Sequence, residues 1–482
     1  MPRRRPVLRW ALPRPLREGP VIDPQTVAQY DLPGHLRAVP DEIDATGLPV
    51  TGALPPELDG RYLRNGPNPL PGQRSGHLQA GHGMLHGVRL SGGRAEWYRN
   101  RWVRTGAFHG RPFVTPDGRV DLASTSANTH VMAHADRVYA LVEVGLPYEV
   151  TPDLGTVGPC DFGGRLTTAM TAHPKRDPAT GELHFFGYGF RPPYLTYHRL
   201  DAKGELVHSR EVPVRAGTMM HDFAVTEHHV VWLDLPMTFQ LALAGQGMPY
   251  GWDDAHGARL GLMRHDRPGA QVTWFDIEPC WIFHVGNAHE DATGRVLMDA
   301  VRYSPQEWTA LWALLSRDDA SRGFVPSDPA VGRARLHRWT LDPATGTATE
   351  QPLDDRVVEF PTIDDDVTGR RSRYLYTVSG SEPRSRDHCA VVKYDLDTGA
   401  CDVHELDEDT MVGEAVFVPA AQGPRQEDDG WLMTITTRRD GSASQLLVLD
   451  ATHVRGGPVA SVDLPRGVPT GFHGSWIPDR RP

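Results

Sequence analysis

Short runs of alternating apolar and polar residues follow one another along most of the chain, from about residue 50 onward. Arg137–Glu143, His229–Asp234 and Gln445–Asp450 are clear examples, because β-branched or aromatic side chains recur in them with a period of two. This pattern predicts β-strands. In four of the turns between the runs an Asp is followed by a Gly within four residues, which is the chemistry that hairpin turns require. These turns begin at Asp177, Asp201, Asp342 and Asp395.

Hairpins at wide and irregular intervals predict a β-propeller whose blades carry insertions. A propeller also accommodates all 482 residues in one domain, and no Ser- or Gly-rich linker divides the chain. The alternative is a pair of stacked β-sandwiches. One helix is expected within residues 304–316, inside an insertion between strands. Ser304 and Glu307 form a capping box there, and Pro305 occupies the first helical position.

Composition and charge narrow the range of functions. The net charge of −11 argues against nucleic acid as the main partner. The four cysteines, Cys160, Cys280, Cys389 and Cys401, form no CxxC pair. So few cysteines in a chain of this length indicate free thiols in a reducing, cytoplasmic environment. No apolar run approaches the length of about 18 residues that spans a bilayer.

The first 45 residues are expected to form an arm, basic at first and then extended, ahead of a single catalytic propeller domain at residues 46–482. The apolar runs of the arm are interrupted by Arg9, Pro13, Arg14 and Pro15, so an export signal is not predicted. A disordered leader is the favoured interpretation. The alternative is a basic segment that contacts the inner face of a membrane.

Histidine is frequent, with 23 residues, and four of them stand near strand ends among apolar or aromatic neighbours. These are His173, His221, His284 and His473. A buried imidazole needs a polar partner, and the inner strands of a propeller converge on one axis, where distant residues can meet. The pattern alone does not set these four apart from the other histidines. Two closer pairs, His130 with His134 and His228 with His229, lie on strand-like runs and are not expected to bind a metal.

Longer motifs resemble those of the carotenoid cleavage oxygenase family, which includes apocarotenoid oxygenases, retinoid isomerohydrolases and lignostilbene dioxygenases. The resemblance extends from about residue 45 to residue 480. It begins with Leu58–Pro69 and continues through Gly81–Val88 and Trp97–Thr105. The four histidine motifs then follow in family order, ending with Gly471–Trp476. Each motif alone is weak evidence, whereas the ordered set is a strong signal.

The resemblance implies an all-β, seven-bladed propeller with helical and loop insertions that cap one face. It implies one Fe(II) ion per chain, bound by His173, His221, His284 and His473. It also implies that Glu143, Glu359 and Glu414 accept hydrogen bonds from ligand imidazoles, whereas His173 has no such carboxylate. Hydrogen bonds of this kind fix the imidazole tautomer and raise its basicity. Because imidazole also suits Zn, Cu and Ni, the choice of iron rests on the resemblance.

The implied activity is a dioxygenase that cleaves a C=C bond of an apolar polyene with O2 and yields two carbonyl products. Stilbene-cleaving members of the family anchor a phenol with a Lys and a Tyr, and the matching positions here hold Val142 and Trp102. An apocarotenoid is therefore the favoured substrate, ahead of a full-length carotenoid. The first alternative is the same cleavage of a stilbene or phenylpropanoid alkene. The second and least favoured is a metal-free propeller that serves as a binding scaffold.

Side chains near the histidine motifs are candidates for the wall of a substrate tunnel, although each one alone is more typical of core packing. They are Phe108, Met220, Phe239, Trp281, Phe283 and Phe472. Residues 236–250 are short compared with the membrane-binding insertion of some relatives, so only a weak peripheral membrane contact is expected there. His289 stands where the family often has Tyr, and it is expected to face solvent.

Overall fold

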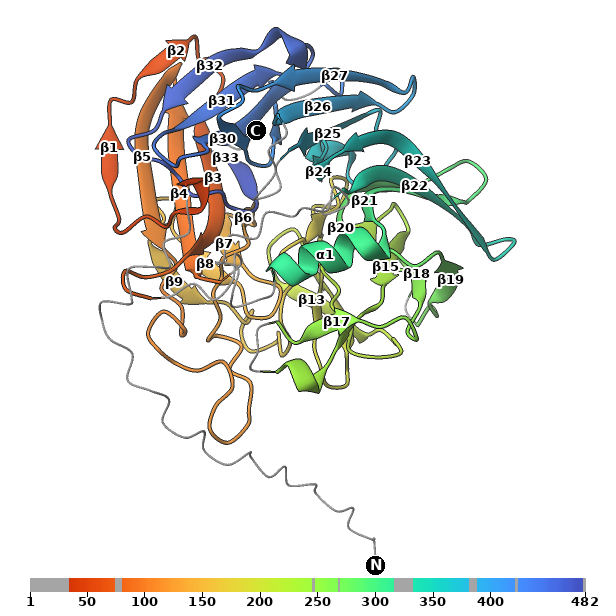
Figure 1. The fold of residues 1–482 in the computed structure, drawn as a ribbon. Coiled ribbons are helices and arrows are strands. Elements are labelled where there is room, and N and C mark those ends of the chain that lie inside the picture. The colour runs from red at the N-terminus through yellow and green to blue at the C-terminus, as the bar shows by residue number, and fades with distance from the viewer. Residues whose placement is uncertain are drawn as a thin grey trace, which may run out of the picture.

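A computed structural model of the chain describes residues 34–73, 80–244, 248–267, 269–315, 333–380, 388–420 and 424–479. Within these residues, seven antiparallel sheets stand as blades around one central axis (Figure 1). The prediction of an all-β, seven-bladed propeller is confirmed, and the alternative of two stacked sandwiches is wrong. Each blade packs its faces against its neighbours, so the core forms a ring of apolar clusters between the blades.

Blades 1 to 4 begin one after another along the chain. Blade 1 contains β1 (Asp44–Thr46), β5 (Arg94–Trp102), β4 (His82–Ser91), β3 (Gly60–Asn68) and β33 (Gly474–Pro478). Blade 2 contains β6 (His130–His134), β7 (Arg137–Leu141), β8 (Tyr148–Val150) and β9 (Thr156–Pro159). Blade 3 contains β10 (Lys175–Arg176), β11 (Leu183–Tyr188), β12 (Leu195–Leu200) and β13 (Leu206–Glu211). Blade 4 contains β14 (Ala224–Val225), β15 (His229–Asp234), β18 (Ala258–Arg264) and β19 (Thr273–Ile277).

The remaining three blades complete the ring. Blade 5 contains β20 (Trp281–Glu290), β21 (Val296–Tyr303), β22 (Arg335–Asp342) and β23 (Thr347–Val357). Blade 6 contains β24 (Glu359–Thr362), β25 (Tyr374–Ser379), β26 (Ala390–Asp395) and β27 (Ala400–Glu405). Blade 7 contains β2 (Val50–Gly52), β32 (Pro458–Asp463), β31 (Ser444–Asp450), β30 (Gly430–Arg438) and β28 (Thr410–Val412), and β29 (Val416–Pro419) also pairs with β30. Short 3-10 helices are η2 (Gly34–Leu36), η3 (Leu241–Leu243), η4 (Asp365–Val367) and η5 (Val454–Gly456).

Strands from the two ends of the described chain close the ring. β33 pairs with β3, with Arg64 opposite Gly474, so the last strand completes the first blade. β2 pairs with β32, so an early strand also completes the last blade. The inner strand β33 lies beside β6 of blade 2 and β29 of blade 7. Closure therefore places the residues just before β33 at the central axis.

The four Asp–Gly turns form as the sequence predicts. In each turn the Gly N–H donates to the Asp carbonyl at 2.8–2.9 Å. Each Gly also adopts a φ between 71° and 80°, the left-handed region that favours glycine. These glycines are Gly181, Gly204, Gly346 and Gly399. They connect β10 to β11, β12 to β13, β22 to β23 and β26 to β27.

The expected helix is α1 (Pro305–Leu315), which lies in blade 5 between β21 and β22 (Figure 1). Its capping box is formed, because Ser304 N–H donates to Glu307 Oε2 at 2.8 Å and Glu307 N–H donates to Ser304 Oγ at 3.2 Å. Trp308 of α1 is fully buried and stacks on Trp281 with ring centroids 4.7 Å apart. The helix is thereby fixed beside the inner strand β20.

A second insertion, in blade 4, contains the hairpin of β16 (Met237–Phe239) and β17 (Tyr250–Trp252). Trp312 Nε1 of α1 donates to Tyr250 O at 2.9 Å, so the two insertions contact each other. No helix among the described residues is long and apolar enough to span a bilayer.

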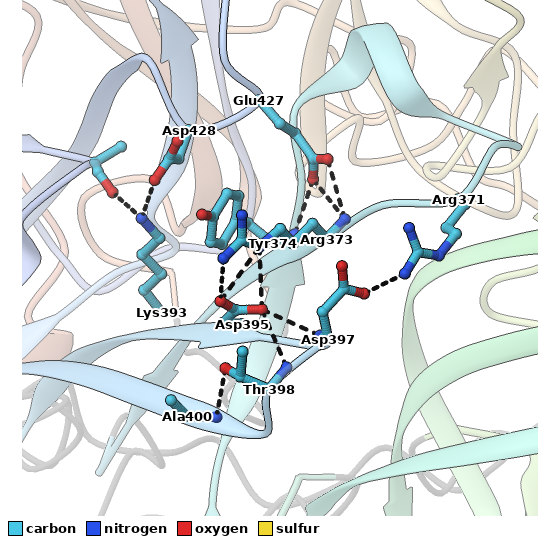
Figure 2. Close-up of polar contacts among 11 residues, drawn as sticks. Arg371, Arg373, Tyr374, Lys393, Asp395, Asp397, Thr398, Ala400, Glu427 and Asp428 are labelled. Atoms are coloured by element: carbon cyan, nitrogen blue, oxygen red, sulfur yellow. Dashed lines mark hydrogen bonds and ion pairs between the residues drawn. The ribbon is translucent and has the colours of Figure 1, made fainter.

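A polar network joins blade 6 to blade 7 (Figure 2). Lys393 Nζ lies 2.5 Å from Asp428 Oδ2 and donates to Ala451 O at 2.7 Å. The same ammonium lies 4.1 Å from the centroid of the Tyr374 ring. Glu427 accepts the backbone N–H of Tyr374 at 2.8 Å. A buried lysine and a loop of blade 7 thus join the two blades.

The division of the chain at residue 45 stays a prediction, because residues 1–33 lie outside the described part. Residues 34–45 contact the propeller. His35 N–H donates to Arg439 O at 3.0 Å, Val39 is buried, and β1 pairs with β5.

Candidate metal centre

Four histidines from four blades meet at the central axis. His173 precedes β10, His221 precedes β14, His284 lies within β20, and His473 directly precedes β33. One nitrogen of each ring lies within 4.8 Å of the corresponding nitrogens of the others, and all four residues are buried. The structure thus brings together the four histidines that the sequence motifs indicate.

A β-bulge aims His284 at the axis. The pairing of β20 with β21 shifts register between Ile282 and Val285, on either side of His284. Bulges of this kind turn a side chain away from the regular alternation of a strand and are frequent next to functional sites.

Three of the four imidazoles are held by buried glutamates. His221 Nδ1 lies 2.6 Å from Glu143 Oε2, His284 Nδ1 lies 2.6 Å from Glu359 Oε2, and His473 Nδ1 lies 2.9 Å from Glu414 Oε1. An ionised carboxylate can only accept, so Nδ1 of each ring carries the proton and donates. The Nε2 lone pair of each neutral ring is then directed at the axis.

The donor set fits a metal ion. The Nε2 atoms of His173 and His221 lie only 3.0 Å apart. His284 Nε2 is buried and has no hydrogen-bond partner among the described residues. Two nitrogens that each lie about 2.1 Å from one ion, at right angles, are about 3 Å apart. Converging lone pairs in a buried site are costly without a cation, so these residues would hold a divalent metal.

Glu359 is the most extensively bonded of the three carboxylates. Its Oε2 also accepts the Phe360 N–H at 2.6 Å, and its Oε1 accepts the Tyr303 hydroxyl at 2.9 Å. Burial raises the pKa of Glu359 to about 7, against the lowering effect of these hydrogen bonds. Phe360 has a φ of 53°, a conformation that is uncommon for a bulky residue. This backbone directs its N–H at the carboxylate.

Glu414 differs from Glu359 in its partners. Oε1 accepts from His473 Nδ1, and Oε2 accepts the Gly474 N–H at 2.8 Å. Burial alone would raise the pKa of Glu414, but His473 and this backbone donor hold it below its usual value. Both oxygens therefore face N–H donors.

His173 has no carboxylate among the described residues. Burial, together with the neighbouring His473, lowers the pKa of His173 well below its usual value. Asp222 supports the backbone next to His173, because Asp222 Oδ1 lies 2.9 Å from Lys175 Nζ. Its other oxygen, Oδ2, accepts the Val285 N–H at 2.8 Å. This one carboxylate links the segments that carry His173, His221 and His284.

Aromatic side chains lie against the ligand rings. Phe283 stacks on His221 with ring centroids 4.1 Å apart and planes inclined by 3°. Phe360 stacks on His284 at 5.1 Å. Both phenylalanines are only partly buried, so they present apolar faces beside the histidines. Trp281 instead packs in the core on α1.

The other residues singled out from the sequence lie farther from the ligand group. Phe108 packs on Trp102 in a small cluster with Val39 and Met84. Phe239 stacks on Phe190 at 4.9 Å near the blade 4 insertion. His289 is half-buried rather than solvent-facing, and burial lowers its pKa below the usual value.

Sequence motifs missed four residues that support the site: His130, Lys175, Asp222 and Tyr303. Lys175 and Asp222 stand within two residues of a ligand, and that proximity was the available signal. Tyr303 and His130 reach the site from other strands, and nothing local in the sequence marks them.

Comparisons with known proteins give matches over most of the chain. The family model described as retinal pigment epithelial membrane protein matches residues 36–478. A carotenoid cleavage oxygenase of Mycobacterium tuberculosis is 38% identical, over 93% of this chain and 97% of the relative. A variant of Synechocystis apocarotenoid oxygenase superimposes with a TM-score of 0.79 at 26% identity, over 95% of this chain and 99% of that chain. Lignostilbene dioxygenase of Pseudomonas brassicacearum gives 0.81 at 26% identity, over 94% and 99%.

The family match covers more than half of the chain, and the bacterial relative is well above 30% identical over nearly its full length. The chain therefore belongs to the carotenoid cleavage oxygenase family and is an enzyme of the oxygenase class.

Proposed function

We propose that this protein is a non-haem Fe(II) dioxygenase that cleaves one C=C bond of an apocarotenoid. One molecule of O2 is consumed, the double bond breaks, and each carbon of that bond becomes a carbonyl. The observation that carries this proposal is the buried group of four histidines whose unprotonated nitrogens converge in a chain of this family. The bound iron would supply the activation of O2.

Four histidines and three glutamates form the proposed iron site. His173, His221, His284 and His473 would ligate one iron ion, and no carboxylate belongs to the ligand group. Glu143, Glu359 and Glu414 fix the tautomers of three imidazoles and place negative charge near the cation. The aromatic faces of Phe283 and Phe360 exclude water from the space beside the ligands.

The two positions that would anchor a phenol, Val142 and Trp102, favour an apolar substrate. Val142 is buried and has no hydrogen-bonding side chain. Trp102 is also buried, and its only side-chain donor, Nε1, is used by Asn68 O at 3.1 Å. Neither residue can bind a phenol, whereas a polyene requires no polar partner. We keep a full-length carotenoid as the second candidate within this class.

The second candidate function is the same cleavage of a stilbene or phenylpropanoid alkene. The observation that favours it is the structural likeness to lignostilbene dioxygenase, with a TM-score of 0.81. The non-catalytic scaffold is set aside, because the chain belongs to a family of oxygenases.

The proposed location is the cytoplasm, with weak peripheral contact to the inner membrane face. All four cysteines are free thiols, as a reducing environment would maintain them. Leu241, in the insertion at 236–250, is 63% exposed, which suits shallow contact with lipid. Nucleic acid is not a proposed partner, in keeping with the negative charge.

Metal analysis tests the iron site. The purified protein should contain one iron per chain, and replacement of any ligand histidine by Ala should abolish cleavage. The His284→Ala variant is the most informative, because Nε2 of His284 has no partner within the part of the chain that the structure describes. Wild-type iron content in that variant would remove His284 from the ligand set.

A side-by-side product assay tests the substrate class. Apocarotenals should be cleaved to aldehydes, and 4-hydroxystilbenes should react poorly, because a buried phenol without a partner loses about 1–3 kcal/mol. The double variant Val142→Lys, Trp102→Tyr should gain activity on the hydroxystilbene. Faster wild-type cleavage of the hydroxystilbene than of every apocarotenal tried would favour the aromatic-alkene alternative and leave the iron site intact.

A further inference from the structure

A fifth histidine, His130, lies between two of the proposed ligands without belonging to the ligand group. Its ring centroid is 6.4 Å from that of His173 and 5.5 Å from that of His473. Its Nδ1 lies 2.8 Å from Ala172 O, and its Nε2 lies 3.2 Å from Ser475 Oγ. A carbonyl oxygen can only accept, so Nδ1 carries the proton and donates. Nε2 then accepts from the Ser475 hydroxyl.

The position of His130 in the ring explains these contacts. His130 begins β6, the inner strand of blade 2, which stands between blade 1 and blade 3. Blade 1 carries His473 and blade 3 carries His173. The adjacent Thr129 accepts the His473 N–H at 3.2 Å. Blade 2 therefore supplies no ligand from its inner strand but touches both neighbouring ligand segments.

His173 is the ligand that most needs such support. No carboxylate among the described residues bonds its ring, so its orientation depends on its backbone. Lys175 ties the following residues to Asp222 at 2.9 Å. The bond from His130 to Ala172 O ties the preceding residue. The ligand is thus fixed from both sides along the chain.

We propose that His130 is a positioning residue for the metal centre, which holds the His173 and His473 segments at the spacing that one ion requires. This inference rests on the proposal that the four histidines bind a divalent metal. His130 performs for His173, through the backbone, the orienting task that glutamates perform for the other three ligands. Loss of such outer contacts typically costs about 10–100-fold in metal affinity.

The test uses Co²⁺ binding to the full-length apoprotein, with affinity measured by chelator competition and ligand geometry by visible absorption. His130→Leu should lower Co²⁺ affinity about tenfold or more and alter the absorption bands. His130→Asn should recover much of the affinity, because its amide can still donate to Ala172 O. Ser475→Ala should lose less affinity than His130→Leu, because the bond to Ala172 remains.

His134→Leu is the matched control. His134 is a buried histidine on the same strand, but its Nε2 bonds Asp201 O at 2.9 Å, at the other end of β6. This variant should keep the wild-type Co²⁺ affinity and spectrum even if its melting temperature falls. An equal loss of affinity in His134→Leu would show a general effect of destabilisation and overturn the proposal.

The remaining outcomes are also decisive. Wild-type affinity and an unchanged spectrum in His130→Leu would overturn the proposal. If His130→Leu does not fold, Ser475→Ala decides, and an unchanged cobalt spectrum in that folded variant overturns the proposal. If the wild-type apoprotein binds no Co²⁺, the proposed metal function fails, and this inference fails with it.

Discussion

The two glutamates Glu359 and Glu414 should respond differently to the same substitution by Gln. Glutamine keeps one acceptor oxygen but replaces the other with an NH2 group that can only donate. Its effect therefore depends on which atom faces each carboxylate oxygen. Both side chains are buried, with 6% and 10% of their side-chain surface exposed, so bulk water offers little compensation.

Glu359→Gln leaves each partner with one hydrogen bond to residue 359. The amide oxygen can replace Oε2, which accepts from His284 and from the Phe360 N–H. The NH2 group can replace Oε1, and the Tyr303 hydroxyl, which now donates, can accept instead. The loss is then limited to the charge assistance of these bonds, which is roughly half their strength. We expect a loss of about 1 kcal/mol, or about fivefold in metal affinity.

Glu414→Gln cannot satisfy both partners in either orientation of the amide. One oxygen of Glu414 faces His473 Nδ1–H and the other faces the Gly474 N–H. The NH2 group must therefore point at a donor, and one buried N–H loses its acceptor. That costs about 1–3 kcal/mol beyond the lost charge, a further factor of about 5–150.

The assay is titration of the apoproteins with Fe²⁺ or Co²⁺ by chelator competition, with the cleavage rate measured on the loaded enzymes. Glu414→Gln should be weaker in both by about fivefold or more relative to Glu359→Gln. Adding Tyr303→Phe should harm Glu359→Gln further, because the NH2 group then loses its acceptor. Equal losses in the two single variants, or a larger loss at Glu359, would refute the reasoning from donor geometry.

Three further predictions concern stability and the metal. In a urea titration, Lys393→Met should lower the free energy of unfolding by about 3 kcal/mol, because it leaves the carboxylate of Asp428 without its cation. Arg371→Met is the comparison, because it breaks the ion pair with Asp397, whose two side chains are 66% and 36% exposed (Figure 2). It should lower the free energy of unfolding by less than about 1 kcal/mol. Burial opposes ionisation of Glu290, but the hydrogen bond from His229 and its neighbours lowers the pKa of Glu290 to about 2. The ionised Glu290 stabilises the fold at pH values above its unfolded-state pKa of about 4.5, and this stabilisation is lost as the pH falls toward 2. The difference in unfolding free energy between wild type and Glu290→Gln, measured in urea, should therefore shrink between pH 7 and pH 3. Removing the metal with a chelator should lower the melting temperature. Adding metal back at a free concentration of 100 times its dissociation constant should raise the free energy of unfolding by about 2.7 kcal/mol. An unchanged melting temperature would contradict metal binding to the folded state.

Local chemistry explains what the sequence could predict. The strands, the Asp–Gly turns and the capping box of Ser304 and Glu307 each depend on residues a few positions apart, and each formed as expected. The four histidines proposed as ligands could be found only through the order of longer motifs, since 189 residues separate His284 from His473.

Contacts between blades explain what the sequence could not predict. Tyr303 and Glu359 are 56 residues apart, and His130 and Ser475 are 345 apart. No pattern of hydrophobicity, turn chemistry or spacing indicates such partners, because they become neighbours only when the ring forms.

Ring closure and completion of the metal centre are linked by the position of one residue. His473 directly precedes β33, the strand that joins the end of the chain to blade 1. Its carboxylate partner, Glu414, stands on blade 7, which is itself completed by the early strand β2. The fourth proposed ligand therefore reaches the axis when β33 is paired with β3. A metal that binds all four histidines must bind the closed ring more tightly than any open form, and it stabilises closure by that difference in affinity. The polar contacts around the ligands thus serve the fold as well as the chemistry.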